Sequence, residues 1–404
     1  MHHPPEVDVA DEGYLAGPQA LLGSLNARAV LDALDRSDEP RARPDLVRAT
    51  GLSKPTVTKA LDALLAHGVV SEAGIDTDRR GPAATLYTVD PGHGHALGVQ
   101  IGHRRVRVCV IDLAGAELSR AEADVGGETA DSPKALADAV ARTAERACTD
   151  AGIAADRPAH AVVGVPAIVG ADRRTIRVGR GLPRSGEGLV AALDDALPVP
   201  FVLENDANLA ALAERRVGTV RDLDDFVVLR LGTGLGAGVF LGGRLHRGIA
   251  GGAGEVGFLP QPGVPLGESV LARRTVDPDG ETFARAAAGD AEALAWTREY
   301  ARALAQVVAA VSLIVEPGVF VVNAPDTADG PDRAGGHTLV RLVEELLAEL
   351  APELVCQLRL SGVPHDTAVL GGAGWLARDE LKERLFAAAS RAPLHPRPPT
   401  PEHS

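Results

Sequence analysis

Apolar residues repeat at helical spacing near the start of the chain, which predicts three short helices. The first covers 19–34, where leucine, alanine and valine recur every three or four positions, and the second covers 44–50. The third begins after Ser53, a residue type that often caps helix N-termini, and runs to Leu65. Its apolar positions form one inward stripe, so the polar residues near its start are expected on the outer face.

A β-hairpin is expected directly after these helices. Residues 69–70 lead into one strand and 84–89 form the return strand, joined by a turn at 76–82 that carries Arg79 and Arg80. Three helices followed by a hairpin with a basic tip are typical of a winged helix-turn-helix, which reads DNA.

Short hydroxyl and basic side chains at the start of the third helix are suited to contacts with base edges and phosphates in a major groove. Such side chains are also common on solvated helix faces, but the order of the parts favours DNA. The expected contacts are Ser53, Lys54, Thr56, Thr58 and Lys59, with Arg79 and Arg80 reaching a minor groove or the flanking phosphates.

From about residue 95 onward, strand-length apolar runs alternate with helical patterns, which predicts an α/β body. The last helix is expected to be interrupted near 371–374, where glycines cluster. Apart from a strand, glycine turn and strand around 231–241, the expected strands are 96–102, 104–113, 116–125, 160–169, 200–203, 318–322 and 354–360, and the expected helices are 132–151, 188–196, 207–216, 282–288, 293–315, 337–350 and 366–390.

Composition narrows the class of protein. The 404 residues suffice for two or three domains, and with 3% aromatic residues the cores must be aliphatic. A formal net charge of −14 argues against a general polyanion binder, although a small DNA-reading module can lie within an acidic chain. The three cysteines are far apart, which indicates reduced core thiols. Because no signal-like leader or membrane-length apolar run is present, we expect a cytoplasmic protein without membrane contact.

The most distinctive stretch, at 231–258, reads LGTGLGAGVFLGGRLHRGIAGGAGEVGF. Its glycines keep side chains out of a strand–turn–strand bend, so that a ligand can approach the backbone N–H groups. A loop with one carboxylate, Glu255, follows. Taken alone, the stretch is equally well explained as a tight hairpin and a glycine-rich surface loop.

This stretch and the run ENDAN at 204–208 resemble the ROK family, named for repressor, open reading frame and kinase. The segments ATGLSKPTVTKALDALLAHGVV and RRGPAATLYTVDP resemble the DNA-reading heads of ROK repressors, and the resemblance covers about 21–389. It implies a winged helix-turn-helix followed by an α/β, actin-like or hexokinase-like fold, in which two RNase H-like lobes enclose a ligand cleft.

The resemblance also implies roles for single residues. In kinases of the family, the asparagine of ENDAN binds sugar hydroxyls, its aspartate is the general base, and the glutamate of GAGEVG holds a sugar hydroxyl. The sugar contacts implied here are Asn205, Asp206 and Glu255, and the implied phosphate turn is Gly232, Thr233 and Gly234.

This chain departs from the family pattern at the positions that bind magnesium, zinc and adenosine in the kinases. Gln100 stands where the kinases carry a magnesium-holding aspartate, and a neutral amide cannot replace that carboxylate. Phe258 replaces the usual histidine, and the following loop lacks the zinc-binding cysteines, so no zinc is expected. The turn at 323–326 contains proline where the kinases receive adenosine. We therefore expect an inactive kinase-like domain without cofactor, in which Asp206 is a vestigial base.

The leading hypothesis is a regulator, a repressor of carbohydrate metabolism genes, that binds double-stranded operator DNA as a homodimer or dimer of dimers and responds to a sugar or sugar derivative. Two alternatives stay open: an ATP-dependent sugar kinase with a DNA-binding head, and a regulator whose sugar cleft serves only dimerisation. The expected parts are disordered tails at 1–17 and 391–404, the winged helix-turn-helix at 18–90, and the kinase-like domain at 95–390, with lobe I at 95–215 plus 366–390 and lobe II at 216–365.

Overall fold

The computed structural model describes residues 18–37, 39–77, 83–126, 132–179, 181–232, 234–260, 271, 280–325 and 333–391. The chain divides into two compact units. The first unit is Met1–His93 with Lys382–Ser404, and the second is Gly94–Leu381. None of the helices in the described ranges is both long and apolar enough to cross a membrane.

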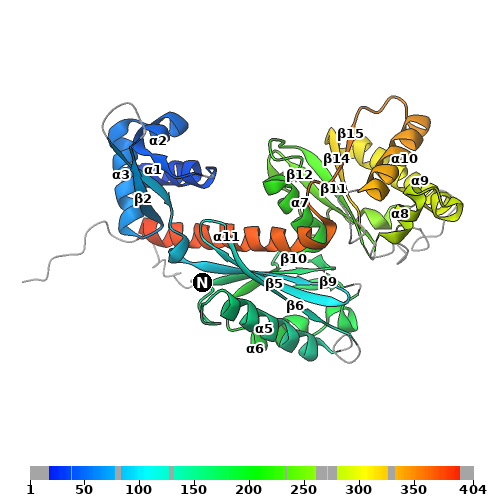
Figure 1. The fold of residues 1–404 in the computed structure, drawn as a ribbon, viewed down its shortest axis with the longest axis horizontal. Coiled ribbons are helices and arrows are strands. Elements are labelled where there is room, and N and C mark those ends of the chain that lie inside the picture. Colours follow the sequence, from blue (N-terminus) through cyan, green and yellow to red (C-terminus); the bar gives the residue numbers. More distant parts are fainter. Residues whose placement is uncertain are drawn as a thin grey trace, which may run out of the picture. The chain divides into compact units, whose positions relative to one another are not determined.

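The first unit contains three N-terminal helices and a small antiparallel sheet (Figure 1). The core of the helices includes the fully buried Leu31, Leu46 and Leu61, one from each helix. These elements confirm the predicted winged helix-turn-helix, while the short strand β1 was not predicted. The helices are α1 (Pro18–Asp35), α2 (Arg43–Thr50) and α3 (Lys54–Ala66), and the sheet has the order β1-β3-β2, formed by β1 (Arg41–Ala42), β2 (Val70–Asp76) and β3 (Ala84–Val89).

The end of the last helix, α11 (His365–Arg391), also belongs to the first unit, where it packs on α1. Lys382 Nζ lies 2.6 Å from Asp35 Oδ2, and both side chains are almost fully buried. At the next residue of α11, the Glu383 carboxylate binds the Arg28 guanidinium of α1. Residues from Lys382 onward therefore group with α1, whereas the sequence pattern assigns the whole of 366–390 to lobe I.

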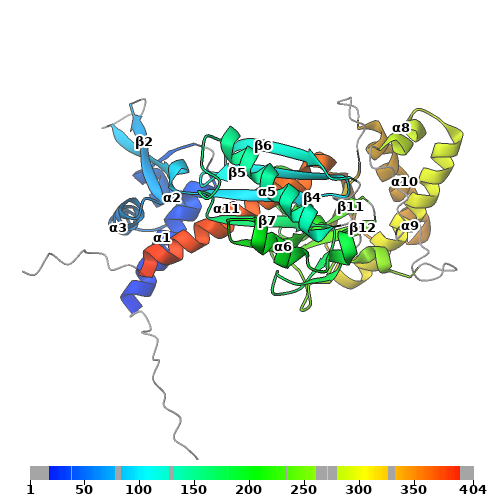
Figure 2. The same cartoon turned by 90° about the horizontal axis from the view of Figure 1, so that it is seen from below.

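The second unit contains two five-stranded sheets. In the first sheet, three antiparallel strands are extended on one side by two parallel strands. Helices α5 (Pro133–Asp150) and α6 (Leu189–Ala196) cover one face of it (Figure 2) and bury an aliphatic core there. The strand order is β10-β7-β4-β5-β6, formed by β4 (His95–Ile101), β5 (Arg105–Asp112), β6 (Glu117–Asp124), β7 (His160–Val165) and β10 (Phe201–Asn205).

The second sheet repeats this topology: its first strand is central, the next two are antiparallel on one side, and the last two are parallel on the other. The repeat confirms the predicted two-lobed α/β body. The strand order is β13-β12-β11-β14-β15, formed by β11 (Phe226–Leu231), β12 (Leu235–Leu241), β13 (Arg244–Leu245), β14 (Val319–Asn323) and β15 (Gln357–Leu360). A separate two-stranded sheet is formed by β8 (Ile168–Val169) and β9 (Ile176–Val178).

Strand β11 is buried on both faces, which explains its nearly continuous apolar sequence. Val227 and Leu229 join the core beneath α9 and α10, whereas Phe226 and Val228 pack with Ala211 of α7 on the opposite face. The helices between β10 and β15 in the chain are α7 (Asp206–Val217), α8 (Glu281–Ala287), α9 (Ala291–Val315) and α10 (Ala334–Leu350).

Helix α11 runs without a break through the glycine cluster, so the predicted interruption near 371–374 is wrong. A Cβ atom on Gly372 would lie 1.9 Å from the Leu209 carbonyl oxygen of α7, and one on Gly98 of β4 would lie 2.5 Å from the Gly374 nitrogen. The glycines are therefore needed where α11 passes close to neighbouring backbone, and they do not end the helix.

Candidate functional site

A cavity of about 110 Å³ lies in the second unit and is lined by residues of both lobes. The predicted residues Asn205, Asp206, Gly232, Gly234 and Glu255 all lie in its wall. They come from the β10–α7 junction, the β11–β12 turn and the loop after β13, so the fold brings together three segments that are separate in sequence.

The β10–α7 junction fixes the orientation of Asn205. Its Oδ1 accepts hydrogen bonds from the backbone N–H groups of Ala207, at 2.9 Å, and Asn208, at 3.2 Å, which caps α7. Its Nδ2 donates to the Ala167 carbonyl at 3.0 Å. Asp206 is the first residue of α7, where the helix dipole favours a negative charge, and its side chain is 32% exposed.

The β11–β12 turn is short and stabilised by its own backbone, since Gly232 N–H donates to the Gly234 carbonyl at 2.9 Å. Thr233, predicted as part of this phosphate turn, lies outside the described residues. Close packing continues along β12, where a Cβ atom on Gly238 would lie 2.5 Å from the Ala207 carbonyl oxygen of α7. Glycine thus allows the sheet of one lobe to approach the helix that carries the cavity's aspartate.

The loop before Glu255 is held against β12. Gly254 has φ of 88°, and its carbonyl accepts a hydrogen bond from Ala237 N–H at 2.8 Å. A Cβ atom at Gly254 would lie 1.8 Å from the Ala237 carbonyl oxygen, so a larger residue does not fit. Glu255 then leads into the 3-10 turn η3 (Val256–Phe258), whose Phe258 also lines the cavity.

Arg230 is a cavity residue that sequence reasoning missed. It lies on β11, is 8% exposed, and donates from Nη1 to Asn323 Oδ1 at 2.9 Å and to the His365 carbonyl at 3.2 Å. Its Nε lies 3.5 Å from Asp206 Oδ2. Burial lowers the pKa of the guanidinium, and the charge of Asp206 partly restores it.

His365, at the start of α11, is fixed beside Arg230. Its Nε2 contacts the Leu231 carbonyl, the last residue of β11 before the glycine turn. Burial first, and then the charge of Arg230, hold the pKa of His365 well below its ordinary value, so the ring is neutral and donates from Nε2. Its position links α11 to the cavity wall.

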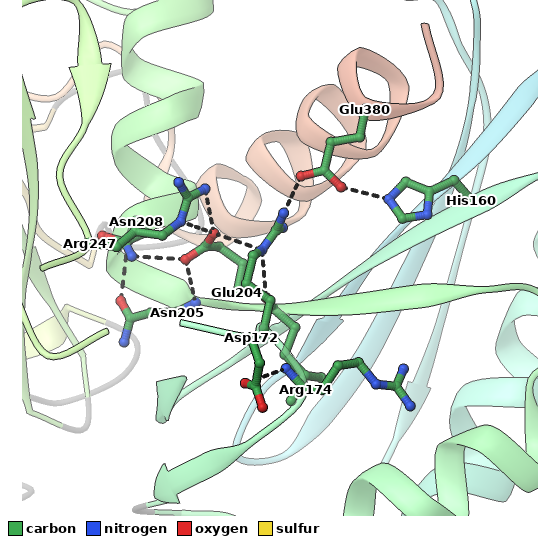
Figure 3. Close-up of polar contacts among 10 residues, drawn as sticks. His160, Asp172, Arg174, Glu204, Asn205, Asn208, Arg247 and Glu380 are labelled. Carbon is green, nitrogen blue, oxygen red and sulfur yellow. Dashed lines mark hydrogen bonds and ion pairs between the residues drawn. The ribbon is translucent and has the colours of Figure 1, made fainter. Parts of the chain in front are cut away.

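The side chain of Glu204, the residue before Asn205, is only 2% exposed. It forms the centre of a polar cluster (Figure 3). Its Oε2 accepts hydrogen bonds from Arg247, with Nη2 at 2.7 Å, and its Oε1 accepts one from Asn208 Nδ2 at 2.9 Å. Because Arg247 follows β13 of one lobe and Glu204 lies in β10 of the other, this ion pair joins the two lobes next to the cavity.

The same cluster reaches α11 through Arg173, which lies 3.6 Å from Glu204 and also binds Glu380. The other carboxylate oxygen of Glu380, Oε2, lies 2.7 Å from Nε2 of the fully buried His160 (Figure 3). Burial raises the pKa of Glu380, but hydrogen bonds from His160 and Arg173 and the charge of Arg173 outweigh it, so the pKa is lowered. Nothing in a single sequence indicates this cluster, because its members are far apart in the chain.

Gln100 lies on β4 with its side chain buried, and its Oε1 has no hydrogen-bond partner within the described residues. It does not line the cavity. No group of three or more histidine, cysteine or acidic side chains suited to a metal ion occurs among the residues described. Burial raises the pKa of the Cys109 thiol to about 12, so this cysteine is an uncharged core residue.

The start of α3 presents the predicted DNA-contacting side chains. Ser53 caps the helix by accepting a hydrogen bond from Thr56 N–H at 3.4 Å, and the two hydroxyl oxygens lie 2.8 Å apart. Lys54 and Lys59 are exposed, and Thr58 is half-buried beside them. The predicted Arg79 and Arg80 of the hairpin turn lie outside the described residues.

Comparison with known proteins found similarity for both parts of the chain. Residues 96–269 match the model of the ROK family, and residues 24–81 match the model of the MarR family. A xylose repressor from Caldicellulosiruptor bescii is 27% identical over 244 residues, 60% of this chain and 60% of the relative. The chain thus spans less than two thirds of this relative's length in the match.

Solved structures resemble the chain over a longer range. A ROK family transcriptional regulator, described as a homologue of the E. coli MLC protein, matches 91% of this chain and 99% of its own with a TM-score of 0.71, at 20% identity. A ROK hexokinase from Thermus thermophilus matches 72% of this chain and 99% of its own, with a TM-score of 0.56 and 28% identity. The first likeness shows the fold of nearly the whole chain.

Proposed function

Because the chain carries a ROK family domain behind a MarR-like winged-helix domain, we propose that it is a DNA-binding transcriptional repressor of carbohydrate metabolism genes. Its effector is a sugar or sugar derivative that binds in the cavity of the second unit. The observation that carries the proposal is that Asn205 and Asp206 from one chain segment meet Glu255 from another in one cavity, in a chain that also exposes the start of α3. Such a regulator acts in the cytoplasm.

In this proposal the side chains of the cavity have separate tasks. Asp206 and Glu255 accept hydrogen bonds from sugar hydroxyls. Asn205 keeps its position through three hydrogen bonds to backbone and offers its remaining Nδ2 hydrogen to the sugar. The sugar binds the DNA-free state more tightly than the DNA-bound state, so it shifts the protein away from DNA.

In the first unit, α3 enters the major groove. Lys54 and Lys59 neutralise phosphates, whereas Ser53, Thr56 and Thr58 lie at the base edges. Arg79 and Arg80 of the hairpin contact the minor groove or the flanking phosphates.

The test of DNA recognition is selection of preferred duplexes from a random library by the full chain, followed by binding measurements at several salt concentrations. Replacing Lys59 by alanine is expected to reduce the slope of log affinity against log salt by about one and to leave the preferred sequence unchanged. Lys134→Ala, which removes an exposed lysine of the second unit, is the matched control and is expected to change neither. A wild-type chain without sequence preference at moderate salt would refute the proposal.

We propose no metal and no nucleotide for the repressor. Gln100, at the position where kinases of the family carry the magnesium-holding carboxylate, is neutral and lies outside the cavity wall. The main competing function is an ATP-dependent sugar kinase, favoured by the likeness to a hexokinase and by Asp206 beside the glycine turn. An ADP-release assay over hexoses and amino sugars separates the two, and turnover that disappears in Asp206→Asn would establish the kinase.

We further propose that the protein is a homodimer or a dimer of dimers. Leu313 and Ile314, adjacent at the end of α9, are 75% and 81% exposed, and exposed apolar pairs of this kind are typical of protein interfaces. Sedimentation of the wild type and of a Leu313→Glu, Ile314→Glu double variant tests this assignment. A smaller species for the variant supports it, and identical sedimentation would place the interface elsewhere.

A further inference from the structure

The guanidinium of Arg230 is a buried cation in the wall of the cavity that we propose binds a sugar or sugar derivative. Burying a cation is costly unless charges and hydrogen bonds compensate for it. Here Nη1 is satisfied by Asn323 Oδ1 and by the His365 carbonyl, both neutral acceptors. The charge must therefore be compensated elsewhere.

Asp206 supplies that compensation. Its Oδ2 lies 3.5 Å from Arg230 Nε, and Nε has no hydrogen-bond partner within the described residues. The two groups attract one another, but the hydrogen bonding of Nε is incomplete. A hydroxyl group in the cavity can accept from Nε and donate to the Asp206 carboxylate at the same time, because it is both acceptor and donor.

The charges around Arg230 and Asp206 disfavour binding of a phosphoryl group or a divalent cation. Among the described lining residues, Asp206 and Glu255 are acidic and Arg230 is basic, so a phosphoryl group would be repelled by two carboxylates. A divalent cation bound to Asp206 would in turn lie close to Arg230. Two unit charges of like sign at 4 Å repel by about 4 kcal/mol at an effective dielectric constant near 20, and a divalent ion doubles this.

We propose that Arg230 determines the ligand specificity of the cavity: as the internal counter-ion of Asp206, it makes the cavity take an uncharged, unphosphorylated sugar without metal or nucleotide, with one sugar hydroxyl held between Arg230 Nε and Asp206. This inference rests on the proposed function.

The first experiment is calorimetric titration of the full chain with D-xylose, D-glucose, N-acetyl-D-glucosamine and the 6-phosphates of the last two. We expect at least one uncharged sugar to bind, with the same affinity in EDTA and in Mg²⁺ with a non-hydrolysable ATP analogue. We expect its 6-phosphate to bind at least tenfold more weakly where one is tested. Tighter binding of the phosphate, or a requirement for Mg²⁺, would overturn the inference.

The second experiment uses variants at the pair. Arg230→Met is expected to weaken sugar binding at least tenfold, and Arg230→Lys, which retains the charge but lacks Nε, at least threefold. Combining Arg230→Met with Asp206→Asn is expected to weaken binding by less than the product of the two single effects, because the residues act together. Arg341→Met, on the exposed surface of α10, is the control with wild-type affinity.

Circular dichroism and thermal unfolding show whether each variant is folded; if Arg230→Met is not, the lysine variant decides. Wild-type affinity in the folded variants would overturn the role of Arg230. If sugar then still releases DNA from the wild type, the proposed repressor survives while this inference fails. If sugar binding depends on Arg230 but never changes DNA binding, the proposed repressor fails while this inference survives. Absence of binding by any uncharged sugar would overturn both.

Discussion

At the residue scale, the cavity depends on a few polar side chains whose surroundings differ sharply from water. Asn205, Asp206 and Glu255 were predicted because they lie in short motifs that resemble those of the ROK family. Arg230 was not, because it occurs once within an otherwise apolar strand. Whether such a residue points to solvent, core or cavity depends on strand register and on the opposite lobe, which local patterns do not contain.

His365 provides a prediction about pH. Its pKa is lowered in the folded chain from an ordinary value of 6.5, so the unfolded chain takes up a proton first as pH falls. Through this group, the free energy of unfolding is constant above pH 6.5 and decreases as the pH falls below 6.5, by up to about 1.4 kcal/mol per pH unit. We expect His365→Gln to make the free energy of unfolding less dependent on pH between 5 and 6.5, as measured by urea denaturation. Parallel pH profiles for variant and wild type would contradict the assignment.

At the element scale, most strands and helices followed from apolar spacing, but the short strands β1 and β9 were not predicted and the glycine cluster of α11 was misread. Glycine lowers helix propensity, so a local prediction places a break there. The structure keeps the helix because Gly372 allows the close approach of α7 and Gly98 allows the close approach of β4 to Gly374. This tertiary packing outweighs the propensity. The information that decides the matter lies in Leu209 and Gly98, far away in sequence.

Neighbouring glycines of α11 give a matched pair of variants. Gly372→Ala places a methyl group against the Leu209 carbonyl oxygen and is expected to destabilise the second unit by about 3 kcal/mol. Gly371→Ala meets no atom within 4 Å and is expected to stabilise it by about 0.5–1 kcal/mol through helix propensity. Chemical denaturation of the two proteins measures both values. Equal effects would show that the close approach of α7 and α11 is not needed.

The part of α11 that packs on α1 gives a second pair. Lys382→Met removes the buried ammonium group that binds the Asp35 carboxylate, and breaking a buried ion pair in this way costs about 3–5 kcal/mol. Glu383→Gln disturbs only a more exposed pair with Arg28, which is expected to cost at most about 1 kcal/mol. Hydrogen exchange of the α1 backbone amides checks the difference. Unchanged protection in Lys382→Met would argue against the packing of α11 on α1.

At the scale of the whole molecule, the order of a winged-helix head and a two-lobed body was predictable. The head has its own pattern of helices and hairpin, and the motifs of the body resemble the ROK family. The allocation of α11 was not, because residues up to Leu381 belong to the second unit and residues from Lys382 to the first. That division depends on contacts such as Lys382 with Asp35, which lie at opposite ends of the chain. A single helix thus supplies structure to the unit that we propose senses sugar and to the unit that we propose binds DNA.

The central claim is that sugar in the cavity weakens DNA binding by the winged helix. Fluorescence anisotropy of a labelled duplex carrying the selected sequence, titrated with the full chain with and without the sugar identified by calorimetry, measures this directly. We predict that saturating sugar raises the Kd for this duplex at least tenfold, about 1.4 kcal/mol, and leaves binding to an unrelated duplex unchanged. An equal Kd with and without a sugar that calorimetry shows to be bound would contradict the account.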